Sequence, residues 1–190
     1  MGFWKAVTGR RDPVPARLDS LFEVPSAAVI LQTETGFVPT GTGSVCYRGA
    51  AGAAFAQTQQ DALDLLNASS AAPDVEVTRD SFGFTWLTVS GDPADPSGLC
   101  TDLHAVNTTL EAAGFGSGLL CTLIPFRDRS DRRLGLVYLY KQGTYYAFAP
   151  TGPQQRDNLL ELQVRDVLSQ ELPMEQDLTR WLALWDAPGL

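Results

Sequence analysis

Basic residues, cysteine and histidine are scarce in this sequence, and long apolar runs are absent. The 190 residues include 14 Lys and Arg against 22 Asp and Glu, which gives a formal net charge of -8 at pH 7. Binding to phosphate backbones rewards clustered Lys and Arg, so this charge balance disfavours it. We therefore expect no nucleic-acid partner.

The cysteines, Cys46, Cys100 and Cys121, lie far apart in the sequence and form no CxxC pair. Neither a disulfide framework nor a zinc knuckle is indicated by this spacing. The sequence also shows no signal-peptide core and no run of the ~20 apolar residues that a membrane span needs. These absences predict a protein of a reducing compartment, and we expect it in the cytoplasm.

What the chain does contain is a pattern of helices, three strands, a long helix, three strands and helices. Alternation on both sides of "RDSFG" predicts a hairpin over residues 74–90. A stripe of leucines predicts the long helix over 97–113, ending at Gly114. Strands joined by short turns are antiparallel. We expect one α+β domain over residues 1–190, an antiparallel sheet with packed helices.

The last third of the chain is predicted to return to helix, first over 156–172 and then over 175–188. In the second segment Trp181, Leu184 and Trp185 have the i, i+3, i+4 spacing of an amphipathic helix. Such an anchor either closes the core or docks a partner helix.

The most aromatic part of the sequence is "LGLVYLYKQGTYYAFAP", a predicted hairpin. Tyr138 and Tyr140 point to one face of a strand, and Tyr145 lies on the next strand. Aromatic residues are enriched where proteins meet partners. One face of this hairpin is therefore either exposed for a partner or covered by a helix of the same chain. We predict a partner-binding surface formed by Tyr138, Tyr140, Tyr145, Trp181 and Trp185.

The only histidine, His104, follows Cys100 by one helical turn, so the two share a face. A thiolate and an imidazole at this spacing suit a metal site or a Cys–His nucleophile, but a metal site needs further ligands. The competing interpretation makes Cys100 a small buried apolar residue. We expect no metal, no cofactor and no catalytic residue, with an enzyme that uses Cys100 and His104 as the alternative.

Residues 1–16 are predicted to form a flexible or amphipathic N-terminal segment. Phe3 and Trp4 flank a basic stretch and suit a foot on a membrane surface or on a partner. The alternative is a frayed terminus whose aromatic rings dock on the rest of the protein, since two helical turns bury little area.

Several longer stretches resemble one known family. They are "TDLHAVNTTLEAAGFGSGLLCTLIPF", "RRLGLVYLYKQGTYYAFAP", "RDNLLELQVRDVL" and "LWDAPGL", together with the opening "MGFWKAVTGR" and "PSAAVILQTETGFVPTGTGSVCY". They are similar to the actinobacterial PspA-associated proteins of the PspAB family. The resemblance covers nearly the whole chain.

The resemblance implies a non-enzymatic accessory protein, encoded near a PspA homologue, in a phage shock type of membrane-stress response. Its partner would be a PspA-type protein, which is a coiled-coil protein, and the family offers no catalytic residues to carry over. The order of elements is also similar to the fold of type III secretion chaperones, which are acidic and often dimeric. We therefore expect a protein-interaction module. The resemblance leaves open whether the protein forms a homodimer and whether it makes a peripheral membrane contact.

Overall fold

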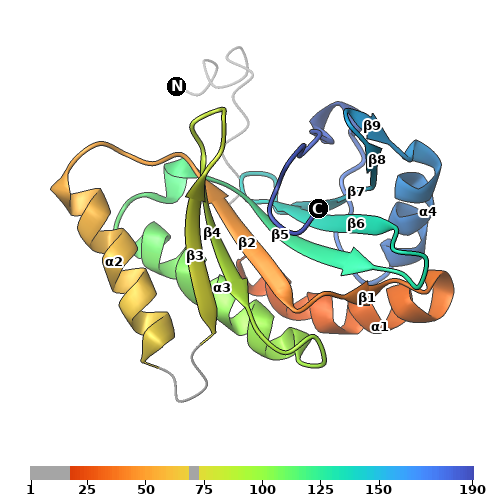
Figure 1. Ribbon diagram of the computed structural model, residues 1–190, viewed down its shortest axis with the longest axis horizontal. Helices are drawn as coiled ribbons and strands as arrows, with labels where there is room; N and C mark the ends of the chain where they lie inside the picture. Colours follow the sequence, from red (N-terminus) through yellow and green to blue (C-terminus); the bar gives the residue numbers. More distant parts are fainter. Residues whose placement is uncertain (1–17, 69–72) are drawn as a thin grey trace, which may run out of the picture.

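The computed structural model describes residues 18–68 and 73–190. Its main feature is an antiparallel sheet with the strand order β3-β4-β2-β5-β6-β7, to which β1 adds by pairing with the end of β5 (Figure 1). A small hairpin of β8 and β9 follows β7. The strands are β1 (Val38–Pro39), β2 (Thr42–Tyr47), β3 (Asp74–Arg79), β4 (Thr85–Ser90), β5 (Leu119–Arg127), β6 (Arg133–Leu139), β7 (Thr144–Phe148), β8 (Pro150–Gly152) and β9 (Gln155–Arg156).

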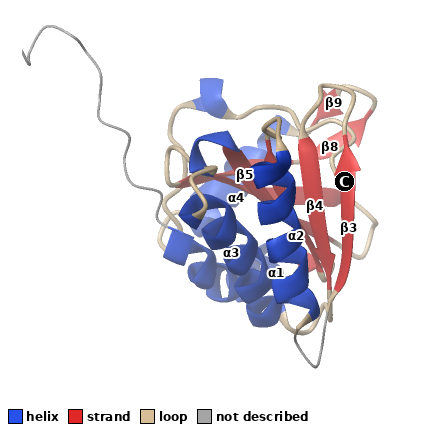
Figure 2. Cartoon of the chain, turned by 90° about the vertical axis from the view of Figure 1, so that its left-hand side faces the viewer, coloured by secondary structure: helices blue, strands red, loops and turns tan. Residues whose placement is uncertain are grey.

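All four α-helices lie on one face of this sheet, so the molecule has two layers (Figure 2). Within the helical layer α2 packs on α3, α3 on α1 and α1 on α4. The helices are α1 (Val24–Thr35), α2 (Ala53–Asn67), α3 (Pro96–Ala112) and α4 (Asn158–Leu168), with short 3-10 helices at η1 (Leu18–Glu23), η2 (Gly116–Gly118) and η3 (Leu178–Arg180). The predicted α+β class is confirmed.

The ends of the helices are set by local sequence signals. Asp95 accepts a hydrogen bond from the Gly98 amide at 2.9 Å and so caps α3, and proline follows it directly at the first helical position, where it costs no hydrogen bond. Gly36 adopts φ 80° and closes α1 through its amide, which donates to the Gln32 carbonyl at 3.0 Å. A residue with a side chain is strained in that left-handed conformation, so glycine is the residue that ends this helix without cost.

Apolar side chains are buried on both faces of the sheet, in two separate clusters. Leu87 and Val89 on β4 point to the helices, and Trp86, which directly precedes Leu87, points to the opposite face, as the period of a strand requires. The hairpin of β3 and β4, predicted from this alternation, is confirmed in register from Asp74 opposite Ser90 to Arg79 opposite Thr85. The sheet therefore needs cover on both faces.

The second face is covered by the C-terminal strap, which we define as residues 173–190. The prediction of a helix over 175–188 is wrong, because the strap contains only the short η3 and otherwise runs without regular structure across the sheet (Figure 1). The strap first adds to the edge of β7: the Tyr145 amide donates to the Pro173 carbonyl at 2.9 Å, and the Glu175 amide donates to the Tyr145 carbonyl at 2.7 Å. Contacts with the sheet override the helical pattern.

Candidate functional site: a cleft on the strap face of the sheet

The tyrosines expected to form a partner surface are part of the core. Tyr138 and Tyr145 are fully buried, Tyr140 is 5% exposed, and all three belong to the cluster between the sheet and the helices. The Tyr145 hydroxyl donates to the Ser20 carbonyl at 3.0 Å. The exposure that the prediction required is absent, because the helices of the same chain cover this face. A partner cannot reach these rings in the folded protein.

The two tryptophans of the strap close the opposite face of the sheet. Trp181 is 7% exposed and stacks on Tyr146 with ring centroids 5.9 Å apart. Trp185 is half-buried and meets Phe148 edge to face at 5.1 Å. Core closure, one of the two roles left open for this segment, is therefore what Trp181 performs, whereas Trp185 remains accessible along part of its ring.

A buried carboxylate fixes the path of the strap. Glu175 accepts hydrogen bonds from the Thr144 hydroxyl and the Asp177 amide, both at 2.9 Å, and from the Arg180 guanidinium at 3.3 Å. Burial raises the pKa of Glu175, but these hydrogen bonds outweigh burial and hold its pKa below the usual value. Further along, the Tyr146 hydroxyl donates to the Leu182 carbonyl at 2.9 Å. The strap is held by a few specific contacts at these points.

The strap leaves part of this sheet face uncovered, and an apolar cleft of about 470 Å³ forms there. We call it the strap cleft. Its size lies within the range of small-molecule and side-chain pockets, roughly 300–1,000 Å³. It is lined by Cys46, Asp80, Phe82, Phe84, Trp86, Leu120, Cys121, Leu139, Lys141, Gln142, Tyr146, Leu182, Ala183, Leu184 and Trp185.

One wall of the strap cleft is the tip of the hairpin between β3 and β4. The Asp80 carboxylate accepts hydrogen bonds from the Phe82 and Phe84 amides at 2.9 Å and from the Trp86 indole at 3.0 Å. Burial raises the pKa of Asp80, but these hydrogen bonds outweigh it and lower the pKa overall. The same contacts hold Phe82 at the tip with its ring 75% exposed. Leu182, on the strap, is 62% exposed beside the cleft.

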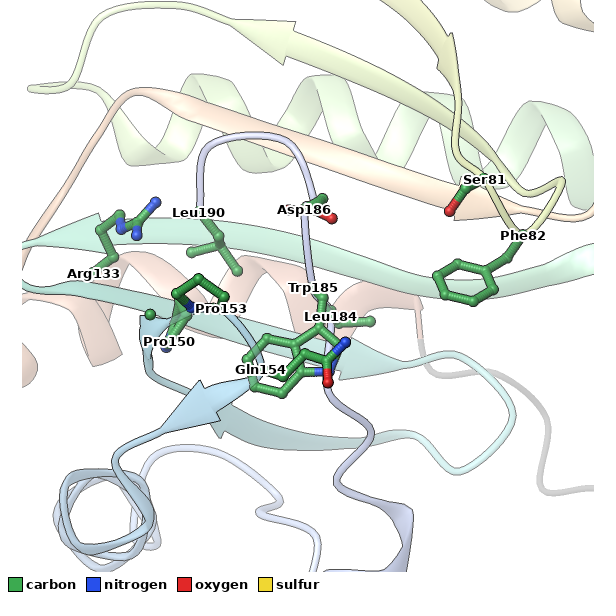
Figure 3. Close-up of a pocket in the computed structure, with 11 residues that line it drawn as sticks. Ser81, Phe82, Arg133, Pro150, Pro153, Gln154, Leu184, Trp185, Asp186 and Leu190 are labelled. Carbon is green, nitrogen blue, oxygen red and sulfur yellow. The ribbon is translucent and has the colours of Figure 1, made fainter.

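A second hollow of about 420 Å³ adjoins the strap cleft and shares Phe82, Leu184 and Trp185 with it (Figure 3). Its other residues come from the turn between β3 and β4, from the start of β6 at Arg133, from the hairpin of β8 and β9, and from the end of the strap, which includes Asp186. The apolar surface on this side of the molecule is therefore wider than the strap cleft alone.

Cys100 and His104 lie on α3, on the helical side of the sheet and away from the strap cleft. Cys100 is fully buried, and burial followed by the nearby Asp95 carboxylate raises the pKa of its thiol to about 12. A thiol with such a pKa holds its proton at neutral pH and is a weak nucleophile. The His104 ring meets Phe22 at 4.8 Å, and its Nε2 lies 3.4 Å from an Asp19 carboxylate oxygen. These contacts suit the buried-residue interpretation of Cys100.

Two properties of the described residues bear on the remaining alternatives. Residues 18–68 and 73–190 contain no cluster of three or more His, Cys, Asp or Glu side chains placed to hold a metal ion. In the same part of the chain, none of the helices combines the length and the apolar character needed to cross a bilayer. Phe3 and Trp4, the predicted foot, fall outside the described residues, as does the whole segment 1–16.

Most of the strap cleft was not predicted from the sequence, since its residues are separated by up to 139 positions, from Cys46 to Trp185. Of the predicted site residues that the structure describes, only Trp185 lies in the cleft. One signal was present in the sequence: Phe82 stands within the turn "RDSFG", where an aromatic side chain has few neighbours to cover it. An apolar residue at a hairpin tip indicates a surface that something else contacts.

Fold and site together define a two-layer α+β protein with an apolar cleft on the less covered face of its sheet. The family model of PspA associated protein B, PspAB, matches residues 1–189, so the chain belongs to this family. Its name indicates association with PspA. Neither a curated protein nor a solved structure matches the chain, and the likeness to type III secretion chaperones stays a prediction.

Proposed function

We propose that the protein is a non-enzymatic interaction module of the cytoplasm that binds a PspA-type protein through the strap cleft. The observation that carries this proposal is the apolar cleft with Phe82 and Leu182 exposed beside it, in a chain whose family is named for association with PspA. A PspA-type partner is a coiled-coil protein, and a helix of such a protein presents a stripe of apolar side chains. Apolar grooves accept such stripes.

Several features of the strap cleft support this kind of binding. Five of its 15 lining residues are aromatic, and buried aromatic residues contribute much of the binding energy at many interfaces. The tip that carries Phe82 is preorganised by Asp80, so little conformational entropy is lost when a partner covers it. The protein's formal charge of -8 favours a partner whose helix carries basic residues beside the apolar stripe.

The test is a titration of the full chain with the PspA-type protein of the same organism, followed by calorimetry. Phe82→Asp places a charge where the proposal needs an apolar contact, and it removes little packing because the ring is 75% exposed. Loss of an aromatic hot spot costs about 2 kcal/mol or more, so we expect binding to weaken by roughly 30-fold or more.

Leu159→Asp is the matched control, because Leu159 is 79% exposed on α4 and does not line the strap cleft. The control should bind like the unmodified chain. Equal affinity of the Phe82→Asp variant and the unmodified chain would exclude the strap cleft as the contact surface. Absence of binding in all three proteins would remove the direct PspA interaction itself.

The alternative enzyme, the membrane foot and the homodimer remain proposals. An enzyme using Cys100 and His104 remains the alternative function, and the burial of Cys100 supports the interaction module instead. The membrane foot at Phe3 and Trp4 is tested by flotation of the full chain and of a chain starting at residue 17 with anionic liposomes. A homodimer is tested by sedimentation velocity.

A further inference from the structure

Two cysteines from different strands meet on the floor of the strap cleft. Cys46 on β2 and Cys121 on β5 are directly paired partners in the antiparallel ladder. Both point to the strap face of the sheet, both belong to its apolar cluster, and both line the cleft. The Cys121 thiol has the largest effect on the pKa of Cys46, which it raises. No sequence pattern indicates this pair, because the two residues are 75 positions apart.

The backbone geometry of this pair suits a covalent bond. Directly opposite residues of an antiparallel pair have Cα atoms about 4.5–5.5 Å apart. Disulfides span Cα distances of about 4.4–6.8 Å, so the spacing of directly paired residues falls within the range that a disulfide bridges. The ladder between β2 and β5 shifts register immediately after Cys46. Such an irregularity locally changes the direction of side chains and the twist of the strands.

The residues around Cys46 and Cys121 determine which forms of the two thiols are favourable in the strap cleft. Trp86 and Tyr146 flank the thiols in the apolar cluster, and the Asp80 carboxylate is the charge that acts on Cys46 from the hairpin. The neighbouring Cys121 thiol and burial both raise the pKa of Cys46, so the Cys46 thiol keeps its proton at neutral pH. A disulfide is also neutral. Oxidation of the pair therefore places no charge in the apolar cleft, unlike formation of a stable thiolate.

Access to the pair comes from the cleft itself. Cys46 is 3% exposed and Cys121 is 7% exposed, but both face a cavity of about 470 Å³ that opens at the surface. Cys100 provides the contrast, since it is fully buried on the other side of the sheet and lines no described pocket. A small uncharged reagent can reach Cys46 and Cys121 without unfolding the chain.

We propose that Cys46 and Cys121 are a redox pair that forms a reversible disulfide across β2 and β5 on the floor of the strap cleft. This inference goes beyond the proposed function and does not depend on it. The oxidant is a small uncharged disulfide. One chain thiol loses its proton and attacks a sulfur of this disulfide, which forms a mixed disulfide and releases one small thiolate.

The second chain thiol then loses its proton and attacks the sulfur of the first cysteine. The bond between the two cysteines forms, the mixed disulfide breaks, and the second small thiolate leaves. The two protons from the chain end on the two departing thiolates. In total the two cysteines lose two electrons, and one small disulfide gains them and is reduced to two thiols. Because the raised pKa of Cys46 disfavours its thiolate at neutral pH, we expect the exchange to be slow and to accelerate with rising pH.

The experiment treats the folded full chain with 2-hydroxyethyl disulfide, blocks the remaining thiols after denaturation, and maps the peptides by mass spectrometry. The reduced chain has three free cysteines. We expect one disulfide between Cys46 and Cys121, within one chain, and a single blocked thiol at Cys100. A reducing agent should restore all three thiols, and the midpoint of thermal unfolding should rise on oxidation and fall on reduction.

The Cys100→Ala variant is the matched control and should form the same disulfide. The Cys46→Ala and Cys121→Ala variants should form none. Three unchanged thiols in the unmodified chain would overturn the proposal, as would a disulfide that includes Cys100 or one that joins two chains. These outcomes are read from the unmodified chain, so they stand even where an alanine variant folds poorly.

Discussion

The two faces of the sheet bury a similar kind of aromatic side chain under very different cover. On the helix face, Tyr138 and Tyr145 lie beneath a continuous layer of helices and are fully buried. On the strap face, Tyr146 and Phe148 are covered by an irregular segment, and an apolar cleft remains open beside it. The alternation of a strand sends aromatic rings to both faces, so the covering segments determine which face stays accessible.

This contrast separates stability from binding. A face sealed by helices contributes packing and exposes little that a partner can recognise. A face covered by a strap is held at a few points, among them Glu175, Trp181 and the contact between Tyr146 and Leu182. Apolar surface can then stay open without unfolding the core. Substitutions on the two faces should therefore differ in size and in kind.

The largest loss of stability is expected on the helix face, for Tyr145→Ala. Tyr145 is fully buried, contacts the Tyr138 ring at 4.9 Å and donates to the Ser20 carbonyl. Truncation of a buried aromatic residue costs about 3–5 kcal/mol. Tyr145→Phe keeps the ring and should lose only about 1 kcal/mol. Guanidinium unfolding measures both values, and a loss below about 1 kcal/mol for Tyr145→Ala would show that the helix face is not the main core.

The next effect is expected in the middle of the strap, for Trp181→Ala. Its indole stacks on Tyr146 and donates to the Glu175 carbonyl at 3.2 Å. We expect a loss of about 3 kcal/mol, at the lower end for a buried aromatic residue, because the strap can shift to fill the space. Trp185→Ala should cost about 1–2 kcal/mol, since that ring is half-buried. Equal losses at the two positions in guanidinium unfolding would contradict this account of the strap.

A smaller effect, which depends on pH, is expected at Glu175. Its pKa in the folded protein is lower than the usual value, so its stabilising contribution is complete above the pKa of the unfolded chain, about 4.3, and declines as pH falls through the lower folded value. Glu175→Gln should lose roughly 1–2 kcal/mol at neutral pH and show a weaker pH dependence of stability below pH 4.3. Tryptophan fluorescence during acid titration measures this. An unchanged acid profile in the variant would show that Glu175 does not hold the strap.

The smallest effect is expected for Cys100→Ala on α3. The side chain is buried, so a loss of about 1 kcal/mol in thermal or denaturant unfolding is reasonable for the removal of one sulfur atom. Binding of the PspA-type protein should stay unchanged, as should any cellular phenotype. A folded variant that loses the phenotype would favour the alternative in which Cys100 and His104 perform chemistry.

How far the sequence predicts this molecule depends on whether a feature is local. The hairpin around "RDSFG" and the helix ending at Gly114 were predicted correctly, because alternation, helical spacing and turn residues act over a few positions. The strap was predicted as a helix because Trp181, Leu184 and Trp185 have helical spacing. In the structure the two tryptophans pack on Tyr146 and Phe148, and these distant contacts determine the backbone path.

The candidate site was harder to predict for the same reason. Strand periodicity shows that Tyr138 and Val137 point to opposite faces, but it cannot show which face the helices cover. The helices cover the face with Tyr138, so the surface that was expected to be exposed is buried. Cys46 and Cys121 become neighbours only through the pairing of β2 with β5. Such pairing follows from the whole topology rather than from any short motif.

The most direct test of the difference between the two faces is amide hydrogen exchange of the full chain, with and without the PspA-type protein. The account predicts slower exchange on binding at three segments that line the strap cleft, residues 80–84, 139–142 and 182–185. It predicts no change along α2 and α3. Protection along these helices with none around the cleft would contradict the account and place the partner on the helix face.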